Sequence, residues 1–188
     1  MVSRLRLTHN SPPELFLDRL PKSTREAFLR CTKLPLFARS GWYLAGGTAL
    51  ALHAGHRQSV DLDFFTPQKS FRDLAVERAL LATHAWRTTY REQGTIFGTL
   101  LDARMSLIAY PFFTPSQKKF RYGTVKILTP GDIAAMKIIA ISQRGRKRDF
   151  VDLYWYCRNH EPLAEILSRA VTQYPGQERN MGHIIKSL

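Results

Sequence analysis

This chain contains the segment Trp42-Tyr43-Leu44-Ala45-Gly46-Gly47-Thr48-Ala49-Leu50, in which an aromatic, apolar run stops at two glycines and good helix formers follow. The pattern predicts a strand, a glycine turn and a helix that ends near Gly55. The next segment, Val60-Asp61-Leu62-Asp63-Phe64-Phe65, alternates acids with apolar residues. Because alternate side chains of a strand share a face, we expect Asp61 and Asp63 to project together.

The remaining elements extend this unit on both sides. Helical spacing predicts two short helices over residues 15–34 and a helix over 71–83. Extended runs are expected at 86–91, 95–101, 104–110 and 124–128, followed by helices at 130–143, 150–157 and 162–171. We therefore predict an α+β fold, a mixed sheet with flanking helices. Its core spans residues 1–128 and a C-terminal helical part spans 129–188.

Composition narrows the class of protein. The chain has 188 residues and a formal charge of +13, an excess that favours a polyanionic partner such as RNA. Cys31 and Cys157 stand alone without metal-ligand spacing, which favours a reducing cytoplasm over a disulfide framework. No stretch approaches the roughly 18 apolar residues of a membrane span, so we expect no membrane association.

The acid pair is a candidate metal site. Mg²⁺ prefers hard oxygen ligands and is commonly held by one or two carboxylates plus substrate phosphates. Asp61 and Asp63 suit that role. The pair taken alone also fits a solubility device on an exposed strand, because acids are common there.

The glycine turn is a candidate phosphate site. Gly46 and Gly47 would let backbone N–H groups approach phosphate oxygens at a helix N-terminus, where Thr48 adds a hydroxyl donor. The alternative is an ordinary tight turn, and a P-loop is excluded because no Gly-Lys-[Ser/Thr] follows. The combination of turn and acid pair is more specific than either alone.

Three further positions stand out in the second half of the chain. Lys137 is the one charge in an otherwise apolar helix, so it must either reach solvent or meet an anion such as a triphosphate. Arg148 and Asp152 lie at i,i+4, where a surface ion pair is the simplest interpretation. His53 and His56 are near Asp61 and Asp63 in the sequence, but a transition-metal site is less favoured for them than a structural role.

These motifs resemble the AbiEii/AbiGii-like abortive-infection toxins, which have a nucleotidyltransferase fold of the DNA polymerase beta-like superfamily. The similarity lies in Gly46 to Leu50, His56 to Phe65, Asp132 to Lys137 and Gln143 to Tyr154, and it covers roughly Gly41 to Tyr156. The resemblance implies that Lys137 binds phosphate and that the cluster of Arg148, Asp149 and Asp152 belongs to the active site. By the same resemblance, Asp152 is a further metal ligand or orients Lys137, and Arg57 and Ser59 contact substrate phosphate.

One position departs from the superfamily pattern. A third carboxylate, serving as base or metal ligand, usually stands on a later strand of the sheet. Ser106 occupies about that place here, which leaves Asp102 or Asp152 as substitutes.

The resulting expectation is a Mg²⁺-dependent enzyme that moves NMP from an NTP to an acceptor hydroxyl. The resemblance implies the toxin of a bacterial toxin–antitoxin or phage-defence pair, with an antitoxin partner and the 3′ end of tRNA, or another RNA, as acceptor. Two alternatives stay open: transfer to a protein hydroxyl, and a degenerate fold that binds RNA or a protein without catalysis.

Overall fold

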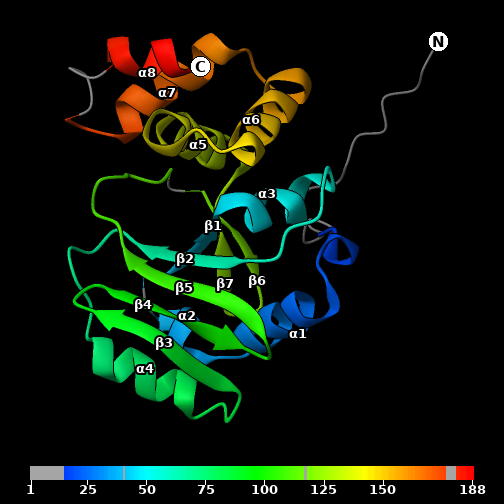
Figure 1. The fold of residues 1–188 in the computed structure, drawn as a ribbon, viewed down its shortest axis with the longest axis vertical. Helices are drawn as coiled ribbons and strands as arrows, with labels where there is room; N and C mark the ends of the chain where they lie inside the picture. The colour runs from blue at the N-terminus through cyan, green and yellow to red at the C-terminus, as the bar shows by residue number, and fades with distance from the viewer. Residues whose placement is uncertain (1–14, 40, 117, 177–180) are drawn as a thin grey trace.

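The computed structural model describes residues 15–39, 41–116, 118–176 and 181–188 (Figure 1). Within these residues the strands are β1 Tyr43–Ala45, β2 Leu62–Thr66, β3 Trp86–Glu92, β4 Thr95–Leu100, β5 Ala103–Ala109, β6 Phe120–Tyr122 and β7 Val125–Ile127. They form one sheet in the order β3-β4-β5-β2-β1-β7-β6. The sheet is mixed, because β2 runs antiparallel to β1 and parallel to β5.

The helices cover the sheet from two sides. They are η1 Leu17–Arg19, α1 Lys22–Cys31, α2 Pro35–Arg39, α3 Gly46–Ala54, α4 Asp73–Leu81, α5 Pro130–Arg144, α6 Lys147–Asn159, α7 Leu163–Gln173 and α8 Met181–Ser187. In Figure 1, α4 lies at the lower end of the molecule against β3, and α5 to α8 gather at the upper end. Helix α3 lies between the sheet and this upper group, where it contacts β1, β2, α5 and α6.

Strand β2 has the alternation that the sequence predicts. Leu62, Phe64 and Thr66 are buried on one face. Asp63 and Phe65 are only partly buried, on the other face. Asp61 directly precedes the first residue of the strand, which is therefore shorter than expected at its beginning.

Helix α5 begins and ends as its sequence signals indicate. The Thr129 hydroxyl accepts a hydrogen bond from the backbone N–H of Asp132 at 3.2 Å, and Pro130 takes the first helical position. Gly145 ends the helix in a left-handed conformation with φ of 52°. The helix is buried along most of its length, which explains why its sequence is almost uniformly apolar.

Three elements among the described residues are additional to those expected. Helix α2 follows the region in which two helices were expected, over residues 15–34. Strand β6 has three partly exposed or exposed residues, so it carries no apolar alternation that would reveal it. Helix α8 follows the last helix expected from the sequence. The turn between β4 and β5 is formed by Leu101 and Asp102, which both have positive φ. Strand β4 therefore ends, and β5 begins, one residue earlier than the runs 95–101 and 104–110 indicate.

No helix among the described residues combines the length and the apolar character needed to cross a membrane.

Candidate active site

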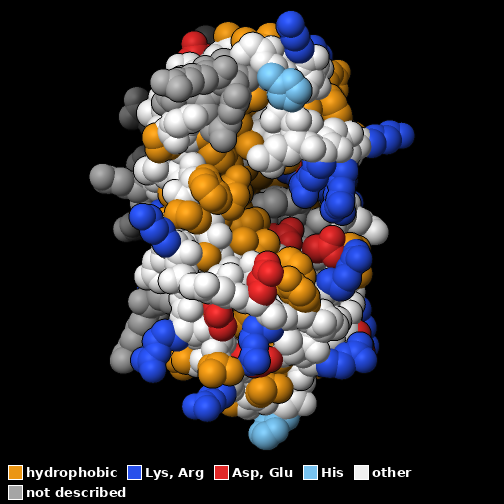
Figure 2. Space-filling model, turned by 60° about the vertical axis from the view of Figure 1, so that its left-hand side comes forward, with side chains coloured by type: hydrophobic (Ala, Val, Ile, Leu, Met, Phe, Trp, Pro, Cys, Tyr) orange, Lys and Arg blue, Asp and Glu red, His pale blue; other side chains and the backbone are white. Residues whose placement is uncertain are grey.

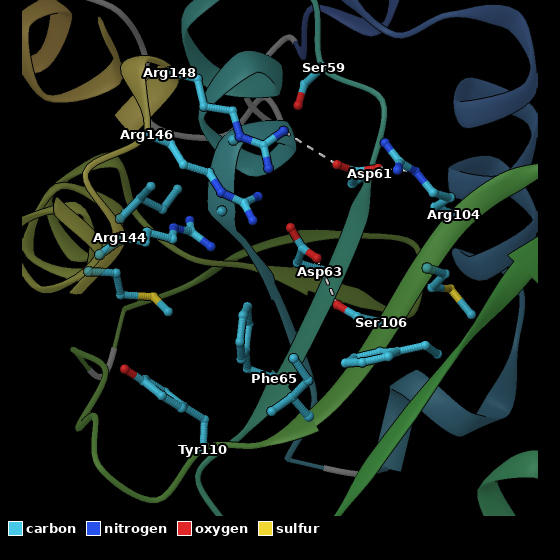
Figure 3. A pocket seen from close by; sticks show the side chains of 18 of the residues that line it. Ser59, Asp61, Asp63, Phe65, Arg104, Ser106, Tyr110, Arg144, Arg146 and Arg148 are labelled. Carbon is cyan, nitrogen blue, oxygen red and sulfur yellow. Dashed lines mark hydrogen bonds and ion pairs between the residues drawn. The ribbon is translucent and has the colours of Figure 1, made fainter. Parts of the chain in front are cut away.

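A cavity of about 840 Å³ opens where β1 ends and β2 begins, beneath the junction of α5 and α6 (Figure 3). Its wall combines three kinds of side chain: two carboxylates, six cations and a group of apolar residues. The carboxylates are Asp61 and Asp63; the cations are Arg57, Arg104, Lys137, Arg144, Arg146 and Arg148; the apolar and aromatic group includes Phe65, Ile108, Tyr110, Ile133, Met136 and Tyr174. Figure 2 shows the mouth as a hollow with acidic side chains at its floor, basic ones above them and apolar ones beside them.

Asp63 lies at the centre of the cavity floor. In the parallel pairing of β2 with β5 it stands opposite Ser106, whose hydroxyl donates a hydrogen bond to Asp63 Oδ1 at 2.7 Å. The other oxygen, Oδ2, lies beside Gly46, where an added Cβ would be 3.0 Å away. Gly46 also has φ of +70°, so both its conformation and its closeness to Asp63 favour glycine. The β5 residue opposite Asp63 is thus a serine and not a carboxylate.

Asp61 is held by the loop that leads into β2. The Thr48 hydroxyl, buried in the first turn of α3, donates a hydrogen bond to the backbone carbonyl of Asp61. It also lies 2.9 Å from the Ser59 hydroxyl. Thr48 is therefore absent from the cavity wall, whereas Ser59 lines it. The contacts of Thr48 orient the acid loop.

The carboxylate of Asp61 has two arginines nearby. Arg104 Nε lies 2.9 Å from Oδ1, and Arg148 Nη1 lies 3.6 Å from Oδ2. The Arg104 contact lacks hydrogen-bond geometry, and buried Oδ1 has no hydrogen-bond partner among the described residues. Asp61 Oδ1 is thus ion-paired with Arg104 but accepts no hydrogen bond. The carboxylates of Asp61 and Asp63 together supply oxygen ligands that suit a hard cation such as Mg²⁺.

In the part of the chain that the structure describes, no third side chain joins Asp61 and Asp63 to complete a metal site made by protein ligands alone. Across the described ranges, no group of three or more His, Cys, Asp or Glu side chains is placed to hold an ion. Asp102, one substitute suggested by the sequence, is exposed in the β4–β5 turn and does not line the cavity. A Mg²⁺ ion bound at Asp61 and Asp63 would therefore depend on substrate oxygens or water for its other ligands.

Gly47 makes room for a side chain. A Cβ at this position would lie 2.2 Å from Nη2 of Arg57, so the guanidinium occupies the space that a larger residue would need. Arg57 is held there by Asp152, to which it donates from Nε at 2.6 Å and from Nη2 at 2.8 Å. The glycine turn thus brings a cation, in addition to backbone N–H groups, to the N-terminus of α3.

Asp152 and Asp149 are fully buried beneath the cavity wall. Besides Arg57, Asp152 contacts His56 Nε2 at 2.8 Å and Lys137 Nζ at 2.7 Å. Asp149 accepts from Lys137 Nζ at 2.6 Å and from Arg144 Nε at 3.0 Å. The Lys137 side chain therefore does not extend to solvent. Its ammonium group is held at the cavity wall by two carboxylates.

The ionisation of these acids follows from their surroundings. Burial raises the pKa of Asp63, and the negative charge of Asp61 adds to this, while Ser106 opposes it. For Asp152, burial alone would raise the pKa, but hydrogen bonds from Arg57 and His56 and the charge of Lys137 outweigh it. The pKa of Asp152 is therefore well below its ordinary value. Asp152 therefore stays charged as a counter-ion to the cations.

The two histidines have structural partners. His53 Nε2 lies 2.9 Å from the backbone carbonyl of Leu128, and His56 contacts Asp152 and the ring of Trp155. These contacts agree with the structural role that the sequence favours over a transition-metal site.

The structure brings most of the candidate residues to one cavity and places three behind its wall. Those that line it are Gly46, Gly47, Arg57, Ser59, Asp61, Asp63, Lys137 and Arg148. Those behind the wall are Thr48, Asp149 and Asp152. Arg104, Arg144 and Arg146 also line the cavity and were not singled out from the sequence, although the run Arg144-Gly145-Arg146-Lys147-Arg148 is an evident basic cluster. Figure 3 shows Arg144, Arg146 and Arg148 approaching the two acids from the α5–α6 junction.

A family model described as nucleotidyl transferase AbiEii toxin, type IV toxin–antitoxin system, matches residues 28–104 and 99–180 of the chain. The uncharacterized protein aq_aa25 of Aquifex aeolicus (strain VF5) is 37% identical over 147 residues, which are 77% of this chain and 70% of that protein.

Solved structures share the fold at low sequence identity. The antibiotic-resistance factor ANT(2'')-Ia has a TM-score of 0.60 at 12% identity, covering 88% of this chain and 100% of that one. A putative nucleotidyltransferase from H. pylori has a TM-score of 0.53 at 14% identity, covering 89% and 92%. MenT4, a nucleotidyltransferase toxin from Mycobacterium tuberculosis H37Rv, has a TM-score of 0.52 at 14% identity, covering 80% and 65%. These similarities confirm the nucleotidyltransferase fold expected from the sequence.

Proposed function

Because the chain belongs to the AbiEii family of nucleotidyltransferase toxins, we propose that its cavity uses Mg²⁺ to transfer NMP from an NTP to a hydroxyl of RNA. The observation that carries this proposal is the position of Asp61 and Asp63 in front of six cations in one cavity. The 3′ end of tRNA is the acceptor that we favour. The same proposal makes the protein the toxin of a bacterial toxin–antitoxin or phage-defence pair, with a cognate antitoxin.

The triphosphate binds to the basic wall. Arginine guanidinium groups match phosphate oxygens with paired N–H donors, and lysine adds a point charge. Arg57 lies beside Gly47 at the N-terminus of α3, whose backbone N–H groups also favour an anion. Lys137 lines the cavity from α5 and shares Asp152 with Arg57. The apolar end of the cavity, where Phe65 and Tyr110 lie in the lower part of Figure 3, is left for the nucleoside.

Asp152 is a positioning residue in this proposal. Its carboxylate contacts Arg57, His56 and Lys137, so its oxygens are engaged with cations and have little capacity left for a metal ion. It holds two phosphate-binding cations in fixed places relative to each other. Its removal is therefore expected to weaken NTP binding more than metal binding.

Asp61 and Asp63 would hold the metal ion, whose bound charge lowers the cost of negative charge developing on the transferred phosphate. The acceptor oxygen forms a bond to the α-phosphorus, and the bond from that phosphorus to the bridging oxygen of the β-phosphate breaks. Pyrophosphate leaves, and the hydroxyl proton passes to a carboxylate or to water. Asp61 and Asp63 are the only carboxylates lining the cavity in the part of the chain that the structure describes, so a protein base is one of these two.

The experiment is an incorporation assay with the purified full chain, Mg²⁺, and each α-labelled NTP in turn, offered total tRNA and a protein mixture. We expect label in the RNA fraction with at least one NTP, and none when EDTA removes the metal. Label confined to the protein fraction would replace the RNA acceptor by a protein hydroxyl. No incorporation into either fraction with any NTP would refute the proposed transfer.

A further inference from the structure

Helix α6 has an outer face whose chemistry differs from that of its buried side. At 100° per residue, Lys147, Val151, Tyr154 and Arg158 fall within an arc of about 60° opposite the buried Asp149, Asp152, Leu153 and Tyr156. We call these four residues the α6 stripe. Tyr154 is 66% exposed and Val151 is 42% exposed, and Phe150, 37% exposed, lies at the edge of the stripe.

The charge on this helix is separated by face. Its two acids are Asp149 and Asp152, and both are fully buried against the cations of the cavity wall. Lys147 and Arg158 are exposed, so the outer face has cations and aromatic or apolar side chains with no carboxylate between them. A surface selected only for solubility would more often mix both signs of charge.

The first residue of the α6 stripe, Lys147, lies between two residues that line the cavity, although it does not line the cavity itself. Arg146 and Arg148, which flank Lys147 in sequence, line the cavity, and Arg148 Nη1 is 3.6 Å from Asp61. From this end the stripe extends along the helix for about 16 Å, at 1.5 Å per residue. A chain whose end is in the cavity can therefore follow the helix outward.

We propose that the α6 stripe binds the single-stranded segment of the acceptor RNA that precedes its reacting end. The inference rests on the proposed function for its RNA acceptor and adds the surface that holds it. Single-stranded nucleic acid is bound by aromatic side chains that stack on bases and by cations that follow the backbone, and the stripe supplies both at helical spacing. Tyr154 stacks on a base, and Lys147 and Arg158 contact phosphates.

The test measures RNA binding by the full chain, using fluorescence anisotropy of a labelled single-stranded RNA oligonucleotide over a range of salt concentrations. The double variant Tyr154→Ala/Arg158→Gln removes one exposed ring and one charge from α6. Leu74→Ala/Arg78→Gln is the matched control, because Leu74, 57% exposed, and Arg78, also exposed, have the same i,i+4 spacing on α4 at the opposite end of the molecule (Figure 1). Both variants lower the net charge equally.

We expect the α6 variant to bind RNA about tenfold or more weakly, and the slope of log K against log salt to fall by about 0.7 for the lost cation. The α4 control should bind like the wild type, apart from a small uniform effect of charge. Binding of an NTP, measured by calorimetry, should be the same in all three proteins. Tyr154→Phe, which keeps the ring, should retain most of the RNA affinity.

Equal RNA binding by the α6 and α4 variants would overturn the proposal. It would also be overturned if the α6 variant bound RNA normally but lost a self-association that the wild type has in sedimentation, because the stripe would then be a protein contact. These outcomes are separate from failure of the proposed function. If RNA binds through α6 but no NMP is transferred, the proposal for the α6 stripe stands and the proposed transfer reaction is refuted.

Discussion

Replacing Gly47 with alanine should displace Arg57 from its position over the N-terminus of α3. The new Cβ would lie 2.2 Å from Arg57 Nη2, whereas ordinary contact begins near 3.4 Å, so the guanidinium must move by about 1.2 Å. That movement breaks or lengthens the hydrogen bonds from Arg57 to Asp152, now 2.6 and 2.8 Å. The arginine, not the backbone, is the group that gives way.

The size of the effect follows from two opposing contributions. Losing one hydrogen bond to a charged partner costs about 1.5–3 kcal/mol, while alanine in a helix gains about 0.5–1 kcal/mol over glycine. We expect a net loss of about 1–2 kcal/mol in the free energy of unfolding, which lowers Tm by about 2–8 °C in a domain of this size. NTP affinity should also fall, by about tenfold, because Arg57 no longer faces the phosphates.

The assay is thermal unfolding, followed by circular dichroism, together with calorimetric titration of an NTP. Gly182→Ala on α8 is the matched control, because a Cβ there meets nothing within 4 Å, and it should leave Tm unchanged or raised. In an Arg57→Ala background, Gly47→Ala should no longer destabilise the protein. If Gly47→Ala were as destabilising without Arg57 as with it, the role that we assign to Gly47 would be refuted.

Four further predictions concern stability. Asp152→Asn should lower the free energy of unfolding, measured in urea at pH 7, by about 3–5 kcal/mol, because it leaves buried cations without their counter-charge. A loss below about 1 kcal/mol would contradict this. The pKa values of Asp149 and Asp152 are lowered in the folded protein, so their charged forms stabilise the fold at pH values above the ordinary pKa near 4. As pH falls below about 4, this stabilisation should be lost. In urea titrations, the difference in free energy of unfolding between wild type and Asp152→Asn should shrink over the same range. Burial lowers the pKa of His53, so as pH drops the unfolded chain binds the proton before the folded protein does. The free energy of unfolding should therefore fall as pH drops below about 6.5, and it should fall less steeply in His53→Gln. Equal slopes of this free energy against pH in the two proteins would refute the prediction. Thr129→Ala should cost about 1 kcal/mol in thermal unfolding through the lost helix cap, and no change would show that the cap is not used.

Much of the fold could be predicted because its signals are local. The alternation in β2, the glycine at the end of α3 and the capping sequence of α5 each specify an element within a few residues. The face shared by Asp63 and Phe65 follows from the same alternation. The resemblance put Ser106 on a later strand of the same sheet, and the structure has it on β5, opposite Asp63.

The parts that could not be predicted depend on contacts between distant segments. His56 and Arg57 contact Asp152, which is 96 and 95 positions away in the chain. No local pattern in either segment indicates that the two segments are in contact. The sequence suggested that Gly47 serves phosphate directly, whereas in the structure the space beside it is filled by Arg57. Arg104 reaches Asp61 only because β5 lies next to β2.

Nucleotidyl transfer by Asp61→Asn and Asp63→Asn tests the central claim most directly. Both variants keep the shape of the side chain and remove its charge, and Asp102→Asn, at an exposed turn outside the cavity, is the matched control. With an α-labelled NTP, RNA and Mg²⁺, we expect the rate to fall at least about a hundredfold in each cavity variant and to stay at the wild-type level in the control. Wild-type rates in Asp63→Asn would contradict the assignment of this carboxylate pair as the catalytic centre.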